Sequence, residues 1–493
     1  MVDILEGINR FVWGVPALVL IIGVGIYLSL RTGCAQITLF PRALRMFWSR
    51  ICGGKSSADG VSSYQALCTA LAATVGTGNL AGVAGAIAIG GPGSVFWLWV
   101  CGLLGMVTKY AEALLAVRYR TRNSRGERIG GPMYIITGGM GKNWSWLATI
   151  YCFFGVVAAF GVGNATQTNA VINGINSAVT ALGGNESRLG NVVMGTALAI
   201  LIAVMLLGGA KRIASIAERL VPAAAVFYIL LCVGVLCLRA KAIPGAFSAI
   251  FTGAFSPKSV TGGVIGSAFT ALRVGAARGV FTNEAGMGTA AIAHGAADVK
   301  EPAEQGLMGI MEVFLDTIVI CTMTALVILC SGTPVAYGVD TGMTLTAQAF
   351  SMVYGDWICI PLGLALCCFA IATILGWGMY GARCAQYLFG EQVWRPFVLL
   401  QAVTVIIGAV LSTATVWMLS ETVNGLMVIP NLIALAWLSP VVADITKRFK
   451  HGSSSADGGT YENIYQCKSL RTFSHAEIPP LCSKGKEGGY KNL

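Results

Sequence analysis

Long apolar segments separated by short polar connections make up most of the chain. Each segment is about 20 residues long or longer, which is the length an α-helix needs to cross the hydrocarbon core of a bilayer. The segments are residues 11–30, 64–89, 94–117, 147–172, 191–209, 220–238, 260–293, 307–329, 359–388, 396–416 and 421–438. The pattern predicts an all-α polytopic membrane protein with about 11 transmembrane helices.

Two of these segments carry glycines and polar residues at positions where a simple spanning helix has none. In the second, Gly76 and Gly78 flank Thr77 and precede Asn79; in the seventh, residues 279–286 read Gly-Val-Phe-Thr-Asn-Glu-Ala-Gly. Glycine tolerates backbone conformations that are costly for other residues, so we expect the helices to unwind near Gly76 and near Gly279. Unwound backbone must face protein or a water-filled cavity. Transporters place small ions and zwitterionic substrates at such breaks.

The two interrupted segments share the pattern Asn-x-Ala-Gly, at residues 79–82 and 283–286. A match this short could arise by chance in a chain with 63 glycines, so the topology has to support it. With residues 31–63 in the cytoplasm, about 25 Lys and Arg lie on the cytoplasmic side and about five on the other. The N-terminus is then outside and the C-terminus cytoplasmic. One peripheral helix precedes a 5+5 inverted repeat, and an interrupted helix opens each block.

This partition predicts four parts. Residues 1–63 form an N-terminal transmembrane helix and a basic cytoplasmic stretch, and residues 64–240 and 241–440 form the two repeats. Residues 441–493 are rich in Ser, Gly and Lys and predict a disordered cytoplasmic tail. The first residues lack a basic region before the apolar segment, so we expect no cleaved signal peptide.

Composition agrees with a membrane protein and excludes several functions. The chain is 55% hydrophobic and 11% charged, whereas soluble domains carry about 25% charged residues. The net charge of +11 comes from the cytoplasmic connections, so we expect no nucleic-acid partner. The 15 cysteines form no C-x-x-C pair and there are only three histidines, which argues against a metal or catalytic cluster. Hydrolase, zinc-protease and phosphate-loop motifs are absent, so the sequence predicts no enzyme.

The residues around the breaks are suited to binding sodium and a carboxylate. Sodium is a hard cation that prefers oxygen ligands, and the carbonyls of residues 72–75 can provide them together with Thr74, Thr77, Asn79 and Thr282. The amides of residues 76–79 open a half-helix, where a carboxylate is favoured. No histidine falls inside an apolar segment, which favours sodium over protons as the coupling ion.

Other polar residues in the segments are further candidates. Gln167 is open to substrate contact or to a helix–helix hydrogen bond. Thr373 can offer a hydroxyl to a neighbouring site, and Trp377 is a candidate pocket wall or gate because it lies well inside its segment. Acids within the membrane are functional candidates because burying them is costly. They are Asp316 and Glu112, and Glu112 could instead pair with Lys109 or lie near the cytoplasmic surface. Arg273, Arg278 and Glu284 flank the second break, where they could pair with one another and fix it or form part of a gate.

Several motifs resemble one transporter family. They are residues 279–288, 373–377 (Thr-Ile-Leu-Gly-Trp), 76–79 (Gly-Thr-Gly-Asn), 130–134 (Gly-Gly-Pro-Met-Tyr) and 316–317 (Asp-Thr). The chain resembles the alanine or glycine:cation symporter family, the sodium/alanine symporters, from about residue 11 to residue 448. That family is similar to the leucine-transporter-like superfold with its five-plus-five inverted repeats. The resemblance implies sodium-coupled symport of alanine or glycine into the cell by alternating access.

The resemblance also implies which residues form the sites. Substrate contacts would fall on Thr77, Gly78, Asn79, Gly163, Gln167, Phe281, Thr282 and Trp377. One sodium site would use the carbonyls of Ala72, Val75 and Ala370 with the hydroxyl of Thr373. A second would use Thr74, Asn79 and Thr282, with Asp316 nearby. The implied partners are the lipid bilayer of a bacterial plasma membrane, a small neutral amino acid and co-transported sodium ion, and we expect a monomer.

The sequence departs from the family pattern in two places. Residues 378–383 read Gly-Met-Tyr-Gly-Ala-Arg, where a Ser or Asn, two Tyr and Gly-Glu-Arg are expected, and Ala372 stands where a hydroxyl is common. The first difference leaves the side-chain selectivity open and the second weakens the Thr373 site. A proton-coupled transporter of the same fold, an ion channel, and a membrane enzyme using Asp316 with Glu284 remain as alternatives.

Overall fold

The computed structural model describes residues 14–53, 60–181, 183–255, 268–339, 342–410 and 413–452. The chain divides into two compact units, Met1–Lys447 and Arg448–Leu493. Helix α22 (Ser439–Lys450) covers the start of the segment predicted as a tail. The remainder of that segment, from residue 453, lies outside the described residues.

Helices lie at all the predicted apolar segments. In chain order they are α2 (Val15–Thr32), α5 (Ser63–Thr74) with α6 (Val83–Gly90), α7 (Ser94–Arg118), α9 (Ser145–Phe160) with α10 (Thr166–Ala181), α11 (Arg188–Leu207), α12 (Gly209–Leu238), α14 (Ala268–Asn283) with α15 (Thr289–Gly295), α16 (Pro302–Val313) with α17 (Thr322–Ser331), α19 (Cys359–Phe389), α20 (Trp394–Gly408) and α21 (Thr413–Trp437). By length and composition, six helices of the described residues could cross a membrane, or up to eight if each of two bent pairs is one span. The all-α membrane fold is confirmed, and the number of crossings stays a prediction.

Shorter helices, helical turns and one hairpin complete the fold, some in the connections and some, such as η1, η4 and η6, within the apolar segments. The α-helices are α3 (Ala35–Thr38), α4 (Phe40–Cys52), α8 (Pro132–Ile135), α13 (Ile243–Phe255) and α18 (Met343–Tyr354). The 3₁₀ turns are η3 (Lys142–Trp144), η5 (Ala240–Ala242), η7 (Asp356–Ile358) and η8 (Glu391–Val393). The π-helical turns are η1 (Gly78–Gly82), η2 (Ile136–Met140), η4 (Gly161–Ala165) and η6 (Phe314–Cys321). Strands β1 (Thr121–Arg122) and β2 (Arg128–Ile129) pair antiparallel.

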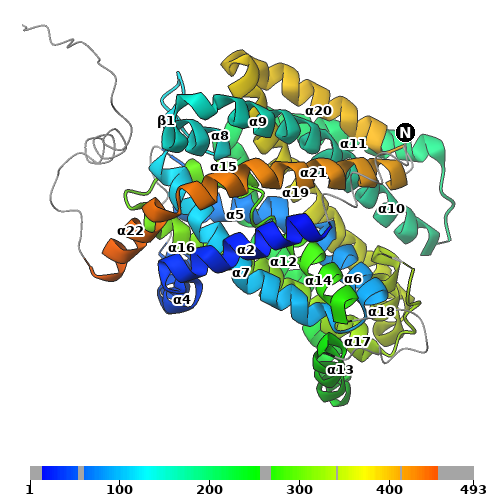
Figure 1. Cartoon of the computed structure of the whole chain (residues 1–493). Coiled ribbons are helices and arrows are strands. Elements are labelled where there is room, and N and C mark those ends of the chain that lie inside the picture. The colour runs from blue at the N-terminus through cyan, green and yellow to red at the C-terminus, as the bar shows by residue number, and fades with distance from the viewer. Residues whose placement is uncertain are drawn as a thin grey trace, which may run out of the picture. The chain divides into compact units, whose positions relative to one another are not determined.

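Helix α7 lines the core of the first unit. It packs against α14, α15 and α16 (Figure 1), and 83% of its most apolar window is buried, against 28% for α11 and for α12. The outer helices expose large apolar side chains, among them Leu189, Ile200 and Leu230, as a surface in contact with lipid requires. The polar residues of α7 therefore face protein.

The first predicted break is confirmed. Helix α5 ends at Thr74, and Val75 is extended, with φ −78° and ψ 96°. The π-helical turn η1 then leads into α6, and the two halves are bent by 53°. The backbone around residues 75–77 consequently leaves the regular helical ladder in the middle of an apolar segment.

The second break is also confirmed, but it lies a few residues beyond the predicted position. Helix α14 continues through Gly279 to Asn283, and Glu284, Gly286 and Gly288 have positive φ angles of 53°, 93° and 77°. Gly279 has another purpose: a Cβ there would lie 3.1 Å from the Cβ of Cys101. Its missing side chain therefore lets α14 approach α7 closely.

The outer ends of the two broken helices meet. Val61, just before α5, forms a parallel bridge with Ala297, just after α15. The Asp298 amide donates a hydrogen bond to the Val61 carbonyl at 2.7 Å. One helix thus begins where the other ends, an arrangement consistent with two repeats of opposite topology.

Candidate functional site

The side chain of Asn79 connects the backbone of the first break to Asp316 through hydrogen bonds. Its Oδ1 accepts a hydrogen bond from the Gly76 amide at 2.9 Å. Its Nδ2 donates to Asp316 Oδ1 at 2.6 Å and to the Asp316 carbonyl at 3.3 Å. The side chain is completely buried. Both ends of one amide therefore hold the unwound backbone against turn η6.

Three of the predicted residues gather around Gly76. A Cβ there would lie 2.7 Å from Thr373 Oγ1 and 3.8 Å from Gln167 Oε1. The Thr77 hydroxyl donates to the same Gln167 oxygen at 3.3 Å. Neither Gly76 nor Gly78 is among the described glycines with positive φ. The expectation that these glycines supply unusual backbone angles is therefore wrong, and at Gly76 the close approach of the Thr373 hydroxyl is what excludes a larger residue.

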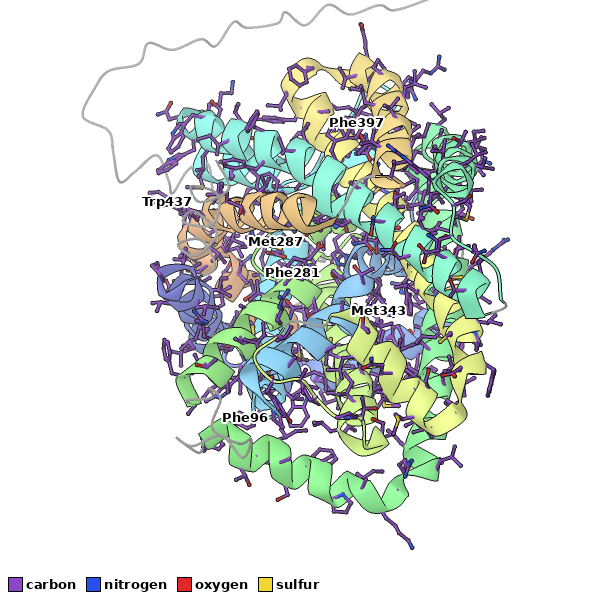
Figure 2. The ribbon with its side chains drawn as sticks, turned by 90° about the vertical axis from the view of Figure 1, so that its right-hand side faces the viewer. Phe96, Phe281, Met287, Met343, Phe397 and Trp437 are labelled. Atoms are coloured by element: carbon purple, nitrogen blue, oxygen red, sulfur yellow. The ribbon has the colours of Figure 1, made fainter. Side chains whose placement is uncertain are left out.

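Gly78 faces the end of α14. A Cβ on Gly78 would lie 3.4 Å from Thr282 Cγ2 and 3.7 Å from the ring of Phe281. Figure 2 labels Phe281 ahead of the second break and Met287 within it. The first break and the residues before the second are thus in contact, as the predicted shared site requires.

Trp377 connects Gly163 to the second break. Gly163 lies against Trp377, since a Cβ there would be 2.6 Å from Trp377 Cγ. The buried indole Nε1 donates to Glu284 Oε1 at 3.0 Å. The other oxygen of Glu284 accepts from the Thr289 hydroxyl at 2.6 Å. The orientation of the tryptophan is therefore fixed by an acid of the break.

The first group of residues expected to bind sodium lies where α5 and α19 pack together. This group is Ala72, Val75, Ala370 and Thr373. A Cβ on Gly376 would lie 3.0 Å from the amide nitrogen of Ala73, so the two backbones are nearly in contact. The Thr373 hydroxyl donates to the Phe369 carbonyl at 3.0 Å, which leaves its oxygen able to act as a ligand.

The second expected sodium group is more dispersed. Cys321, which the sequence did not single out, accepts a hydrogen bond from Asn79 Nδ2 at 3.3 Å and lies against Thr282. The Thr282 hydroxyl donates to the Gly279 carbonyl at 2.9 Å. Thr74 donates within α5 to the Ala70 carbonyl at 3.3 Å, and no hydrogen bond in the described part of the chain joins it to Asn79 or Thr282. Asn79 and Thr282 are therefore brought together, whereas Thr74 is not.

A chain of buried polar side chains lies beside the second break. Lys109 Nζ donates to Glu312 Oε1 at 3.0 Å, and Glu312 Oε2 lies 2.9 Å from His294 Nε2. His294 Nδ1 lies 2.7 Å from Gln305 Nε2, and Ser63 Oγ donates to Gln305 Oε1 at 2.6 Å. None of the five side chains is more than 2% exposed. We refer to these five residues as the Lys109–Ser63 chain.

The sequence pattern did not reveal the Lys109–Ser63 chain, because no histidine falls inside a predicted apolar segment. The predicted segment 260–293 stops one residue before His294, which is fully buried in α15. The spacing of charged residues within the apolar helices could have indicated this chain. Charged residues one helical turn apart in such helices need buried partners, because burying them unpaired is costly. The pairs with that spacing are Lys109 with Glu112 and Glu312 with Asp316.

Glu112 holds the second break instead of pairing with Lys109. Its Oε1 accepts hydrogen bonds from the amides of Gly286 at 2.9 Å and Gly288 at 3.1 Å. It also accepts from Asn431 Nδ2 at 2.7 Å. A carboxylate that accepts several amide protons stabilises unwound backbone that lipid could not.

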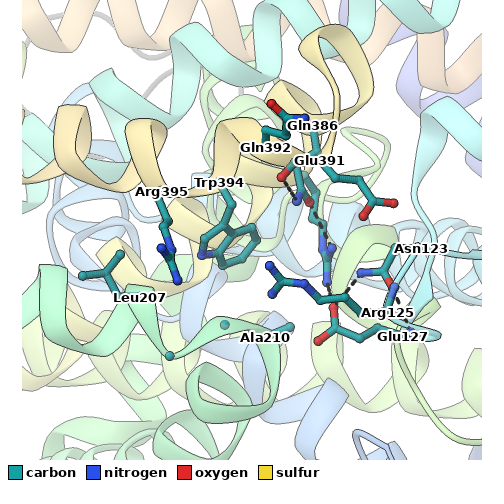
Figure 3. A pocket seen from close by; sticks show the side chains of 13 residues that line it. Asn123, Arg125, Glu127, Leu207, Ala210, Gln386, Glu391, Gln392, Trp394 and Arg395 are labelled. Atoms are coloured by element: carbon teal, nitrogen blue, oxygen red, sulfur yellow. Dashed lines mark hydrogen bonds and ion pairs between the residues drawn. The ribbon is translucent and has the colours of Figure 1, made fainter.

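Two cavities adjoin at the side predicted to be cytoplasmic. Their volumes are ≈ 430 Å³ and ≈ 480 Å³, and both are lined by Arg125, Glu127, Ala210 and Arg383. Arg383 pairs with Glu127 at 3.3 Å. Figure 3 shows Glu391, Trp394 and Arg395 around the smaller cavity. Hydrogen bonds from Ser124 lower the pKa of Glu391.

The departure from the family pattern at Gly378 lies against another helix. A Cβ on Gly378 would be 2.9 Å from the side chain of Leu206 in α11. Trp377, one residue earlier, faces Gly163 and Glu284. A helix turns by about 100° per residue, so the substitution affects packing between α19 and α11 more directly than the face that carries Trp377.

Comparison with known proteins identifies the family of this chain. Residues 1–462 match the model of the sodium:alanine symporter family. The sodium/alanine symporter AgcS of Methanococcus maripaludis is 43% identical over 454 residues, 91% of this chain and 97% of that protein. An uncharacterized transporter of Haemophilus influenzae is 42% identical over 454 residues, 91% of this chain and 96% of that protein.

A solved structure is similar in fold at low sequence identity. The crystal structure of MhsT in complex with L-phenylalanine has a TM-score of 0.54 and 13% identity, covering 80% of this chain and 99% of that one. Its similarity confirms the leucine-transporter-like fold expected from the sequence. With the family match over nearly the whole chain, this chain belongs to the sodium:alanine symporter family, a family of membrane transporters and not of enzymes.

Proposed function

We propose that the protein carries a small neutral amino acid, alanine or glycine, into the cell together with sodium. The observation that most supports this proposal is the contact between the two breaks, where Gly78 lies against Thr282 and Phe281. Two unwound segments meeting inside an apolar protein provide backbone groups that an ion and a zwitterion can satisfy. The relative named as a sodium/alanine symporter supports the same assignment.

The substrate carboxylate binds backbone amides at the start of η1, namely those of Thr77 and Gly78. Gln167 and the carbonyls of the second break receive the ammonium group. The side chain of the substrate then points toward Phe281 and Trp377, with Gly163 closing the wall behind the tryptophan. These large aromatic rings leave space for hydrogen or methyl but not for a branched side chain.

Sodium binds at two places in this proposal. The carbonyls of Ala72, Val75 and Ala370 form one site with Thr373, and the close packing of α5 on α19 supports it. Asn79 and Thr282 form the other beside Cys321, with Asp316 held next to Asn79. Thr74 joins this second site only if its hydroxyl leaves the Ala70 carbonyl.

The proposal places the protein in a bacterial plasma membrane as a monomer, with its N-terminus outside and its C-terminus in the cytoplasm. Residues 64–240 and 241–440 act as the two inverted repeats. The bridge between Val61 and Ala297 supports opposite directions for the helices that carry the breaks.

Uptake by purified protein in proteoliposomes tests the function. Radiolabelled alanine and glycine should accumulate when sodium is high outside, and accumulation should stop when the sodium gradient is removed. Equal uptake driven by a pH gradient in sodium-free medium would replace sodium with protons as the coupling ion. Single-channel currents would support the channel alternative instead.

A further inference from the structure

The Lys109–Ser63 chain is arranged as a one-way series of hydrogen bonds. The Ser63 hydroxyl donates to Gln305 Oε1, so Gln305 uses its Nε2 to donate to His294 Nδ1. A ring nitrogen that accepts carries no proton, so the other nitrogen, Nε2, donates to Glu312 Oε2. In this arrangement the imidazole is neutral and every member of the chain has a partner.

The same residues can also hold a charged imidazole. Protonation at Nδ1 turns that nitrogen into a donor, and rotation of the Gln305 amide by about 180° presents Oε1 to it. Gln305 Nε2 then donates to the Ser63 oxygen, which can accept as readily as donate. His294, Gln305 and Glu312 keep partners within the chain, because an amide and a hydroxyl can exchange their donor and acceptor roles.

The charges around His294 come from four directions. Helix α7 contributes Lys109 and Glu112, α16 contributes Glu312, and the loop before α15 contributes Glu284. Helix α19 adds the buried phenol of Tyr380, which interacts electrostatically with the three acids, and α5 adds the hydroxyl of Ser63. Arg128 of β2 is paired with Asp298 at 2.6 Å, and Tyr134 of α8 packs on Tyr387. Arg120 donates to the Ala297 carbonyl just after α15. Three carboxyl groups therefore lie in the same buried cluster as Lys109 and His294, which favours a proton on the imidazole.

The larger of the two cavities is the candidate route for the proton. Its wall includes Val61 and Ala296, each two residues from one end of the Ser63–Gln305–His294 series. Val61 and Ala297 are also the residues that join the outer ends of the broken helices. The series therefore runs from the cytoplasmic side of the proposed topology to the acid that pairs with Lys109.

We propose that His294 binds a proton from the cytoplasmic side and that its protonation slows sodium-driven uptake. This inference rests on the proposed function. Protonation adds a positive charge at Glu312, one helical turn from Asp316, which holds the Asn79 side chain of the first break. Added positive charge on this side disfavours a sodium ion bound near Asn79. Histidine is the side chain whose charge ordinarily changes between about pH 5 and 8.

Uptake of alanine at a fixed sodium gradient, measured with the internal pH of the proteoliposomes set between 5.5 and 8.5 (roughly the range in which histidine titrates), tests the proposal. We expect uptake to fall by about fivefold at the acidic end, the lower limit of typical coupling between sites. In His294→Gln, which keeps a donor for Glu312 but cannot take a proton, the profile should be flat. The matched control is His451→Gln, because His451 is exposed and its loss should leave the profile unchanged.

Magnetic resonance of histidine-labelled protein provides a test that does not depend on transport. The chain has three histidines, so variants of His451 and His475 assign the signal of His294 by elimination, even if His294→Gln fails to fold. A His294 signal that stays neutral down to pH 5.5, or an identical uptake profile in the wild type and His294→Gln, overturns the proposal. Absence of sodium-driven uptake in the wild type at every pH would refute the proposed function instead, and the resonance titration would still decide whether His294 binds a proton.

Discussion

At the scale of single residues, the site depends on side chains that do two things at once. Asn79 satisfies the Gly76 amide with its oxygen and holds Asp316 with its nitrogen. Trp377 forms a wall against Gly163 and donates to Glu284. A substitution at either position therefore changes both the shape of the site and the partner that the side chain leaves behind.

Asn79→Ala should weaken both alanine and sodium binding. The Gly76 amide would lose its partner and the Asp316 carboxylate would keep only the Thr317 hydroxyl. A buried polar group left unpaired costs about 1–3 kcal/mol. We expect apparent affinities for alanine and sodium to fall by at least about tenfold in uptake assays. Asn176→Ala is the control, since it removes a buried amide that contacts only Asn191; equal losses in both variants would show that Asn79 has no special role.

Trp377→Ala should widen the range of substrates. Removing the ring opens space between Gly163 and Phe281, and a single additional methylene in a fitted pocket is worth about 1–3 kcal/mol. Leucine, which we expect to compete poorly with labelled glycine in the wild type, should compete at least about tenfold better in the variant. Trp377→Phe keeps an aromatic ring but not the donor to Glu284, so it separates size from positioning. If leucine competes as well as alanine in the wild type, these aromatics do not line the site.

At the scale of helices, the second break is held by groups from outside its own segment. Glu112 on α7 and Asn431 on α21 both bind the backbone at Gly286. Three positive φ angles within five residues, at Glu284, Gly286 and Gly288, leave backbone groups that need such partners, because lipid provides none. The shape of the break is thus specified by α7 and α21 as much as by its own glycines.

Glu112→Ala should destabilise the protein and abolish uptake. Two amides and one side-chain donor would lose their acceptor, at about 1–3 kcal/mol for each group. Glu112→Gln keeps an acceptor oxygen and should retain part of the stability. Thermal unfolding in detergent, with the exposed Glu186→Gln as control, measures the difference. An unchanged unfolding midpoint in Glu112→Ala would mean that the backbone of the second break keeps its conformation without Glu112.

The sequence predicted the breaks more reliably than their partners. Gly76, Gly78 and Asn79 identified the first break because polar and flexible residues are conspicuous in an apolar segment. Gly279 misplaced the second, since a glycine needed for close helix packing looks the same in a sequence as one needed for a turn. His294 was missed because burial at the end of a segment depends on tertiary contacts with Glu312 and Gln305, which periodicity does not contain. Helices α13 and α18, with 13 and 12 residues, are shorter than the roughly 20 that a hydropathy pattern detects as a span.

At the scale of the whole molecule, the distribution of positive charge is the basis of the proposed orientation in the membrane. Most of the cations lie in connections on one side, including Arg122, Arg125 and Arg128 around the larger cavity. Positive charge is retained in the cytoplasm during insertion. In the proposed orientation, the ion pair between Arg383 and Glu127 at the shared wall of the cavities faces the cell interior.

Reporter fusions test this orientation. A green fluorescent protein joined after residue 450 should fluoresce, because it folds in the cytoplasm, and alkaline phosphatase at the same position should be inactive. Alkaline phosphatase joined after Lys241, in a connection predicted to be outside, should be active. The reverse pattern would invert the topology and move both cavities to the exterior.

The bridge between Val61 and Ala297 has a mechanical consequence. A single main-chain hydrogen bond contributes only about 1 kcal/mol, yet it joins the outer ends of the two helices on which the breaks are built. Force applied to α5 is transmitted to α15 without passing through the middle of either helix. We expect the two helices to tilt together at this joint, since α5 and α15 also pack against each other. Loss of the joint should uncouple the two breaks, and a carrier whose breaks move independently would pass its driving ion without its substrate.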